Sequence, residues 1–100
     1  MSFNEETIQQ VWEKGKVVEN QDRDVKRQDS AQALIHREDY GDRDSEFGWE
    51  IDHIHPDGGD EISNLQPLQW ENNVAKQDGS FDPAVTSDGD RNIPFEKEGN

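Results

Sequence analysis

An acid and an imidazole stand side by side in this sequence, and a carboxamide follows further along the chain. Asp52 and His53 are adjacent, and Asn73 lies twenty positions after His53. Carboxylate and amide oxygens are preferred ligands of hard cations such as Mg²⁺ or Mn²⁺. Histidine is the side chain that can accept a proton near neutral pH. Together these groups would supply a cation site and a base, which are the requirements for metal-assisted hydrolysis of a phosphodiester.

Two strands and a helix are predicted to position these groups. Alternation predicts a strand over residues 47–54, with Trp49, Ile51 and His53 on one face. The run 56–60 is rich in proline, aspartate and glycine and ends this strand. The elements predicted to follow are a short strand over 64–68 and a helix over 69–77.

The preceding residues predict one more helix and two more strands. Asn4 has the type and position of an N-cap, and Phe3 and Ile8 are spaced as a hydrophobic staple. We therefore expect a helix over 5–14, closed by Gly15. The further predicted strands cover 16–20 and 31–36, on either side of the polar stretch 21–30.

The composition is that of one small acidic domain. The 100 residues include no cysteine, which excludes a disulfide scaffold, a zinc ribbon and a thiol nucleophile. We expect one domain over residues 1–77, with its core motif at 48–77, and an acidic C-terminal tail over 78–100 that is flexible or loosely docked. No apolar run can span a bilayer, and the first residues do not resemble a signal peptide. These features predict a cytoplasmic protein with no membrane partner.

The charge is unusual for a protein that acts on nucleic acid. Acidic residues number 24 and basic residues 10, giving a net charge of −14. Nucleic-acid binders are normally basic, because neutralisation of phosphates supplies much of their affinity. Three interpretations stay open: a solvated acidic surface, adaptation to high salt, and mimicry of a nucleic-acid backbone.

Residues 48–77 resemble the HNH endonuclease family. The resemblance rests on the pair Asp52-His53, on Asn64 before a leucine, on Asn73 in the following helix and on the trailing Lys76. This is the His-Asn-Asn variant, which also occurs in the HNH domains of RNA-guided CRISPR effectors. The upstream residues also look like small bacterial and phage HNH proteins. The resemblance implies an α+β fold with a ββα-metal (HNH/His-Me finger) core, an added N-terminal helix and short strands.

The resemblance also implies a role for each matching residue. His53 would be the general base that deprotonates the attacking water. Asp52 and Asn73 would hold one divalent cation, Mg²⁺ or Mn²⁺. Asn64 would brace the first strand and orient the His53 ring. Products of this family carry 5′-phosphate and 3′-hydroxyl ends.

Several further residues bear on the same site. Some HNH proteins hold a structural zinc with cysteine pairs, but here Gln69 and Asn72 stand where one pair would be, so we expect no structural zinc. We expect the Asn72 side chain to lie on the polar surface. His55 is an additional candidate to contact phosphate or metal, and Lys76 and Arg37 are candidates to contact phosphate.

The sequence therefore predicts a metal-dependent endonuclease acting on DNA, with double-stranded DNA as the expected substrate. The alternative is an acidic, HNH-derived binding module without cleavage activity. Such a module would mimic DNA, or would inhibit or pair with a phage or defence protein. A larger basic protein partner that supplies DNA binding is compatible with the enzymatic interpretation.

Overall fold

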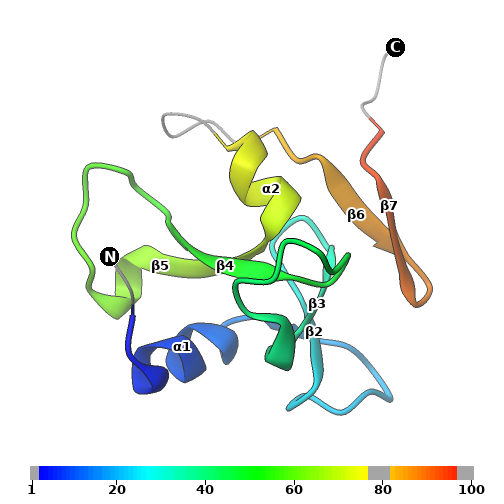
Figure 1. Ribbon diagram of the computed structural model, residues 1–100, viewed down its shortest axis with the longest axis horizontal. Helices are drawn as coiled ribbons and strands as arrows, with labels where there is room; N and C mark the ends of the chain where they lie inside the picture. Colours follow the sequence, from blue (N-terminus) through cyan, green and yellow to red (C-terminus); the bar gives the residue numbers. More distant parts are fainter. Residues whose placement is uncertain (1–2, 77–81, 97–100) are drawn as a thin grey trace.

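The computed structural model describes residues 3–76 and 82–96, which form a small α+β domain of helices and short antiparallel strands (Figure 1). Within these residues, no helix is long and apolar enough to cross a membrane. Two 3₁₀ segments, Arg37–Asp39 and Ile62–Asn64, also occur. The main elements in chain order are α1 (Glu5–Trp12), β1 (Lys16–Val17), β2 (Lys26–Gln28), β3 (Leu34–His36), β4 (Trp49–His53), β5 (Leu65–Gln69), α2 (Trp70–Ala75), β6 (Val85–Asp88) and β7 (Arg91–Pro94).

Helix α1 begins as predicted and ends earlier than predicted. The Asn4 side chain accepts a hydrogen bond of 2.8 Å from the Thr7 backbone N–H, which confirms the N-cap. The helix ends at Trp12, and the next residues continue as turns that bring the Gly15 N–H to the Trp12 carbonyl. A β-carbon on Gly15 would lie 3.2 Å from the Arg27 side chain, so this glycine permits close packing of the chain against β2.

A three-stranded antiparallel sheet in the order β1-β2-β3 replaces the two separate strands predicted upstream. Strand β2 lies within the polar stretch 21–30, where no strand was predicted. Its central residue, Arg27, is buried, donates to the backbone carbonyls of Glu13, Gly15 and Arg23, and lies over the Trp12 ring. Hydrogen bonds to the guanidinium thus allow a polar residue at a buried strand position.

The core lies between α1 and the strands β3, β4 and β5. The rings of Trp12 and Trp49 pack with centroids 5.4 Å apart at the centre of this contact. Ile51 is partly buried against the same cluster. The buried members of this cluster are Ile8, Val11, Trp12, Ile35, Trp49 and Leu65.

Strands β4 and β5 form an antiparallel pair that leads directly into α2. The register pairs Trp49 with Gln69 and His53 with Leu65, as expected for strands that fold back on each other. The Gln69 side chain accepts hydrogen bonds from the backbone N–H groups of Glu71 and Asn72, so the last residue of β5 also caps α2. In Figure 1, α1 lies below this pair of strands and α2 lies above it.

The C-terminal region differs from the expected tail. Residues 82–96 include the hairpin β6–β7, which packs against the rest of the domain. The last residue of the predicted helix 69–77, and residues 78–81 and 97–100 of the predicted tail, lie outside the described residues. The expectation of an exposed Asn72 is wrong, because its buried oxygen accepts from the Ala84 and Val85 N–H groups. Asn92, on β7, bonds to the backbone of Leu34 and Glu46. Side-chain amides therefore dock the hairpin, and such contacts leave no hydrophobic pattern in the sequence.

A buried carboxylate joins the separate parts of the domain. One oxygen of Asp29 accepts from the Ala31 and Ala33 N–H groups, and the other accepts from the Gln69 N–H and the Asn72 amide. Burial raises the pKa of Asp29, and these hydrogen bonds oppose the rise. Asp29 thus links the β2–β3 turn to the junction of β5 and α2.

We predict that Asp29→Asn destabilises the protein by roughly 3 kcal/mol, because an amide nitrogen would face two donors that now bond to a charged oxygen. Urea denaturation followed by tryptophan fluorescence measures the change. Asp44→Asn is the matched control, since Asp44 is exposed. Equal stability of the two variants would contradict the proposed linking role of Asp29.

The partly buried His36 ring, whose Nε2 atom is buried, predicts loss of stability on mild acidification. It stacks on Phe47 at a centroid distance of 4.1 Å, and no partner for its Nε2 occurs among the described residues. Burial is the main cause that lowers the His36 pKa, and the positive charge of Lys26 lowers it further. Three nearby carboxylates raise this pKa and so oppose the shift: Asp39, Glu38 and Glu46. The unfolded chain, with an ordinary pKa of about 6.5, therefore takes up the proton first as pH falls.

We accordingly expect His36 to contribute stability above pH 6.5 that is lost as pH falls through its lowered folded-state pKa. His36→Phe keeps a stacking ring without a titrating group. The measurement is the free energy of unfolding in urea between pH 7.5 and 5 for both proteins. The variant should lose less stability over this range, and an identical loss would refute the assignment.

Candidate functional site

The predicted acid, imidazole and amide line one cavity. Its volume is about 320 Å³, and its lining comes from the end of β4 and from α2 with the residue that follows it. Asp52 and His53 thus meet Asn73, although they are distant in sequence. The full lining is Ile51, Asp52, His53, Pro56, Asn73 and Lys76.

Asp52 is buried and held by two donors. One of its oxygens, Oδ2, accepts from the Gln66 amide and from the Lys76 ammonium, each at 2.9 Å. Lys76 also donates to the backbone carbonyls of His53 and Ile54. Its side chain is only 8% exposed, so Lys76 fixes the end of β4 beneath α2. A contact of Lys76 with phosphate stays a prediction.

Asn73 is oriented by a carboxylate on the strand beneath it. Its amide nitrogen donates to Glu50 at 2.8 Å, which leaves the amide oxygen as its ligating atom. The Glu50 carboxylate in turn accepts two hydrogen bonds from the Arg43 guanidinium, one from Nε at 2.6 Å and one from Nη2 at 2.9 Å. The hydrogen bond from Arg43 is the largest cause that lowers the Glu50 pKa, and the bond from Asn73 acts in the same direction. Sequence reasoning missed Glu50, although its position two residues before Asp52 on β4 was a usable signal.

His53 has a partner that sequence reasoning missed. Its Nε2 lies 2.6 Å from a carboxylate oxygen of Asp60 in the loop between β4 and β5. The ring of Phe3 lies nearby, with centroids 6.3 Å apart, where the N-terminal segment approaches this loop (Figure 1). The composition of residues 56–60 predicts only a turn, so nothing in the sequence indicated that Asp60 contacts His53.

Asn64 fastens the loop, and its side-chain hydrogen bonds go to the backbone of His55 and Gly59 rather than to the His53 ring. Its oxygen accepts from the His55 N–H at 3.0 Å, and its nitrogen donates to the carbonyls of His55 at 3.1 Å and Gly59 at 2.9 Å. A β-carbon on Gly58 would lie 2.5 Å from the Asn64 nitrogen, so a glycine is needed there. The bracing part of the expected role fits this geometry, whereas the ring is contacted by Asp60.

The other two candidates lie outside the cavity. The His55 side chain is exposed, and its recorded bonds to Asn64 are made by its backbone. Arg37 donates to Gln9 and pairs with Glu5 at 2.7 Å, which attaches it to α1. Neither side chain is among those that line the cavity.

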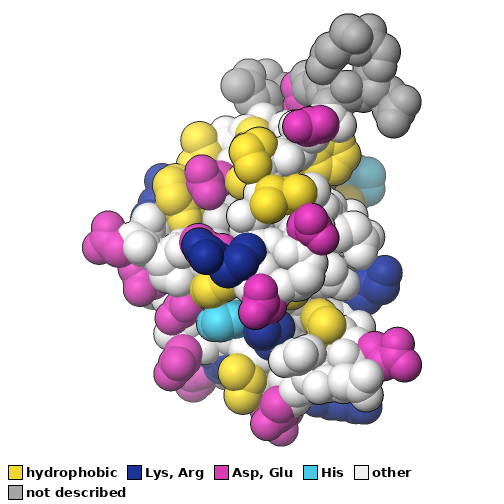
Figure 2. All heavy atoms as spheres, turned by 90° about the vertical axis from the view of Figure 1, so that its right-hand side faces the viewer, with side chains coloured by type: hydrophobic (Ala, Val, Ile, Leu, Met, Phe, Trp, Pro, Cys, Tyr) yellow, Lys and Arg dark blue, Asp and Glu magenta, His cyan; other side chains and the backbone are white. Residues whose placement is uncertain are grey.

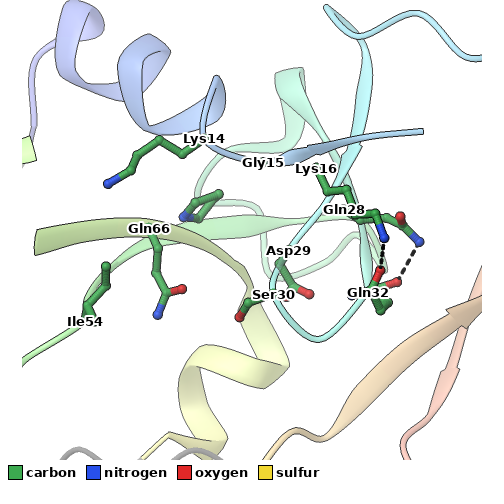
Figure 3. Close-up of a pocket in the computed structure, with 10 residues that line it drawn as sticks. Lys14, Gly15, Lys16, Gln28, Asp29, Ser30, Gln32, Ile54 and Gln66 are labelled. Carbon is green, nitrogen blue, oxygen red and sulfur yellow. Dashed lines mark hydrogen bonds between the residues drawn. The ribbon is translucent and has the colours of Figure 1, made fainter. Parts of the chain in front are cut away.

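A second cavity, of about 290 Å³, lies where the end of α1 meets the β2–β3 turn and β5 (Figure 3). The ammonium groups of Lys14 and Lys16 both bond to neutral oxygens there, including the Gln32 side chain. Its lining holds no imidazole, and the Asp29 carboxylate in it is already saturated by donors. This cavity therefore lacks the groups for hydrolysis.

The donor set of the first cavity fits a hard cation. Asp52 Oδ1 and the Asn73 amide oxygen accept no hydrogen bond from the described residues, and both are hard oxygen ligands. No group of three or more histidine, cysteine or acidic side chains suited to a metal occurs in residues 3–76 and 82–96. A cation held by one carboxylate and one amide would keep several waters, as Mg²⁺ commonly does.

Comparison of the chain with protein-family models, with curated proteins and with solved structures gave no match.

We predict that Asn64→Ala lowers the free energy of unfolding by about 3 kcal/mol, because three part-buried hydrogen bonds of about 1 kcal/mol each are lost. The backbone N–H of His55 should also exchange faster with solvent, which hydrogen-exchange NMR measures. Ser63→Ala, at the neighbouring exposed position, is the control. Unchanged exchange at His55 in the Asn64 variant would show that this carboxamide does not hold the loop.

Proposed function

We propose that this protein is a metal-dependent HNH-type endonuclease that hydrolyses phosphodiester bonds in DNA. The observation that carries the proposal is the meeting of Asp52, His53 and Asn73 around one cavity. The succession β4-β5-α2 supports a ββα-metal core, since it supplies these residues from the first strand and the helix. Asn64 and Lys76 complete the resemblance in sequence and lie in the same part of the fold.

His53 would act as the general base. Its side chain is partly exposed and His53 lines the cavity, so the proposal places the attacking water beside this ring. The water proton passes to the imidazole as the water oxygen bonds to phosphorus. The bond from phosphorus to the 3′-oxygen breaks, and that oxygen takes a proton from solvent. The products carry 5′-phosphate and 3′-hydroxyl ends.

Asp52 and Asn73 would hold the divalent cation through carboxylate and amide oxygens, with Glu50 orienting Asn73. When bound, Mg²⁺ or Mn²⁺ supplies positive charge that stabilises the charge developing on the phosphate and on the leaving oxygen. Lys76 holds the Asp52 carboxylate in place through Oδ2, and no hydrogen bond within the described residues uses Oδ1.

The net charge of −14 opposes binding of a polyanion and sets the conditions for activity. Acidic side chains are spread over the face in Figure 2 among basic and apolar ones, and they do not form one continuous patch. At 1 M salt the repulsion between exposed charges is screened beyond about 3 Å. The divalent cation proposed for the cavity would act on a phosphate at contact distance, where screening is weak. We therefore expect cleavage by the protein alone to need elevated salt.

We predict that the purified protein nicks or linearises plasmid DNA with Mg²⁺ or Mn²⁺ between pH 7 and 8. His53→Ala should reduce the rate at least about 100-fold, because general-base catalysis contributes about 10²–10⁴-fold. Agarose gels across a series from low to molar salt measure the rates. His55→Ala is the matched histidine variant, and its exposed ring predicts cleavage close to that of the original protein. Absence of cleavage at every salt concentration would refute the proposal.

The acidity also favours a second candidate, a binding module that occupies the DNA-binding surface of a basic protein. The favouring observation is the excess of 24 acidic over 10 basic residues, which repels DNA and attracts a cationic surface. The two functions differ in their dependence on His53. A binding module would retain its partner affinity in the His53→Ala variant and would leave DNA uncut, whereas the nuclease loses cleavage.

A further inference from the structure

We infer that Asp60 is the positioning residue for His53, forming an aspartate–histidine pair that directs the Nδ1 lone pair of the base toward water. This inference rests on the proposed nuclease function and adds a residue that the sequence resemblance did not include. It starts from the contact of 2.6 Å between His53 Nε2 and Asp60 Oδ1.

The chemistry of this contact fixes where the ring proton sits. An ionised carboxylate can only accept a hydrogen bond, so His53 Nε2 must carry the hydrogen. In the neutral ring the other nitrogen, Nδ1, then holds the lone pair and can accept a proton from water. When Nδ1 takes that proton the ring becomes cationic, and the Asp60 carboxylate stabilises the new charge at close range.

The surrounding structure holds Asp60 in position. The carbonyl of Gly59, the residue before Asp60, accepts a hydrogen bond from the Asn64 amide nitrogen. The same side chain also bonds to the backbone of His55 at the start of the loop. The start of the loop and the residue next to Asp60 are therefore bonded to one side chain. The ring of Phe3 lies 6.3 Å from the His53 ring, so the imidazole has neighbours besides the carboxylate. Asn64 would thus affect His53 through the placement of Asp60.

The alternative is an incidental surface ion pair. Asp60 is 56% exposed and His53 is 35% exposed, and exposed pairs contribute little to stability. The two alternatives differ in what removal of Asp60 would change. If Asp60 positions the base, its removal should slow cleavage and disturb the His53 tautomer without altering the fold, whereas removal of an incidental pair should leave the cleavage rate unchanged.

The first experiment is long-range ¹H–¹⁵N NMR of the full-length protein without metal, at a pH where the ring is neutral. We expect His53 to be in the Nε2–H tautomer with a downfield Nε2-bound proton, and we expect Asp60→Ala to lose that proton signal. Asp57→Asn removes one charge from the same loop at an exposed position and should keep the signal. A signal that is absent from the original protein, or unchanged in Asp60→Ala, overturns the inference.

The second experiment measures cleavage and metal binding in the same variants. Asp60→Ala should lower kcat about 10–100-fold, the range for residues that orient a reacting group, while Asp60→Asn falls between because its amide oxygen still accepts from Nε2. Asp57→Asn should cleave at the original rate. Affinity for Mn²⁺, measured by calorimetry, should be unchanged in Asp60→Ala, and a loss of affinity would mean that Asp60 is a ligand and would overturn the inference.

The two proposals fail in distinguishable ways. If the original protein cleaves DNA and Asp60→Ala cleaves equally fast, Asp60 has no positioning role and the nuclease function stands. If the original protein does not cleave while the Nε2-bound proton is observed, the pair exists as a structural contact, and both the nuclease function and the catalytic role of Asp60 are overturned.

Discussion

The fold depends on satisfying one buried carboxylate, that of Asp29. A buried charge costs several kcal/mol unless donors surround it, and here the donors come from two separate regions of the chain. The β2–β3 turn must therefore stay against the junction of β5 and α2. The Asn72 amide takes part in this contact and also bonds to the C-terminal hairpin. Because the next residue is Asn73, the same contact fixes the turn of α2 that presents an amide to the cavity.

Of two neighbouring residues, Asn72 thus has a structural role, and Asn73 has the proposed role of metal ligand. Successive residues of an α-helix point about 100° apart, so Asn72 can face Asp29 while Asn73 faces β4. At the other end of the cavity, Lys76 bonds to Asp52 and to carbonyls at the end of β4. Asn73 and Lys76 thus fix this short helix and the residue after it to β4 by polar contacts. The apolar core is mainly elsewhere, between α1 and β3–β5.

Local patterns predicted the elements that carry the candidate site. The alternation around Trp49 and the helical spacing around Asn73 placed β4 and α2 correctly, because such periodicity reflects which face is buried. The N-cap at Asn4 could also be predicted, because Thr7, whose N–H donates to it, is only three residues away.

The elements that the sequence did not reveal depend on contacts between distant polar groups. Strand β2 is stabilised by guanidinium bonds from Arg27, and the hairpin β6–β7 is held by the amides of Asn72 and Asn92. Asp60 reaches His53 across a loop. A polar side chain has the same appearance in a sequence whether it is solvated or bonded to a distant partner, so periodicity cannot separate the two cases.

The difference between buried and exposed charge also bears on how an acidic chain could act on DNA. Exposed carboxylates interact through water and are screened by salt, so their repulsion of a polyanion falls as ionic strength rises. The pair formed by Asp52 and Lys76 has side chains only 10% and 8% exposed and is screened far less. Added salt should therefore weaken the barrier to substrate approach while leaving the internal geometry of the site intact. The net charge and the local charge of the site are thus separate properties, and the strongly acidic composition does not by itself exclude phosphodiester chemistry.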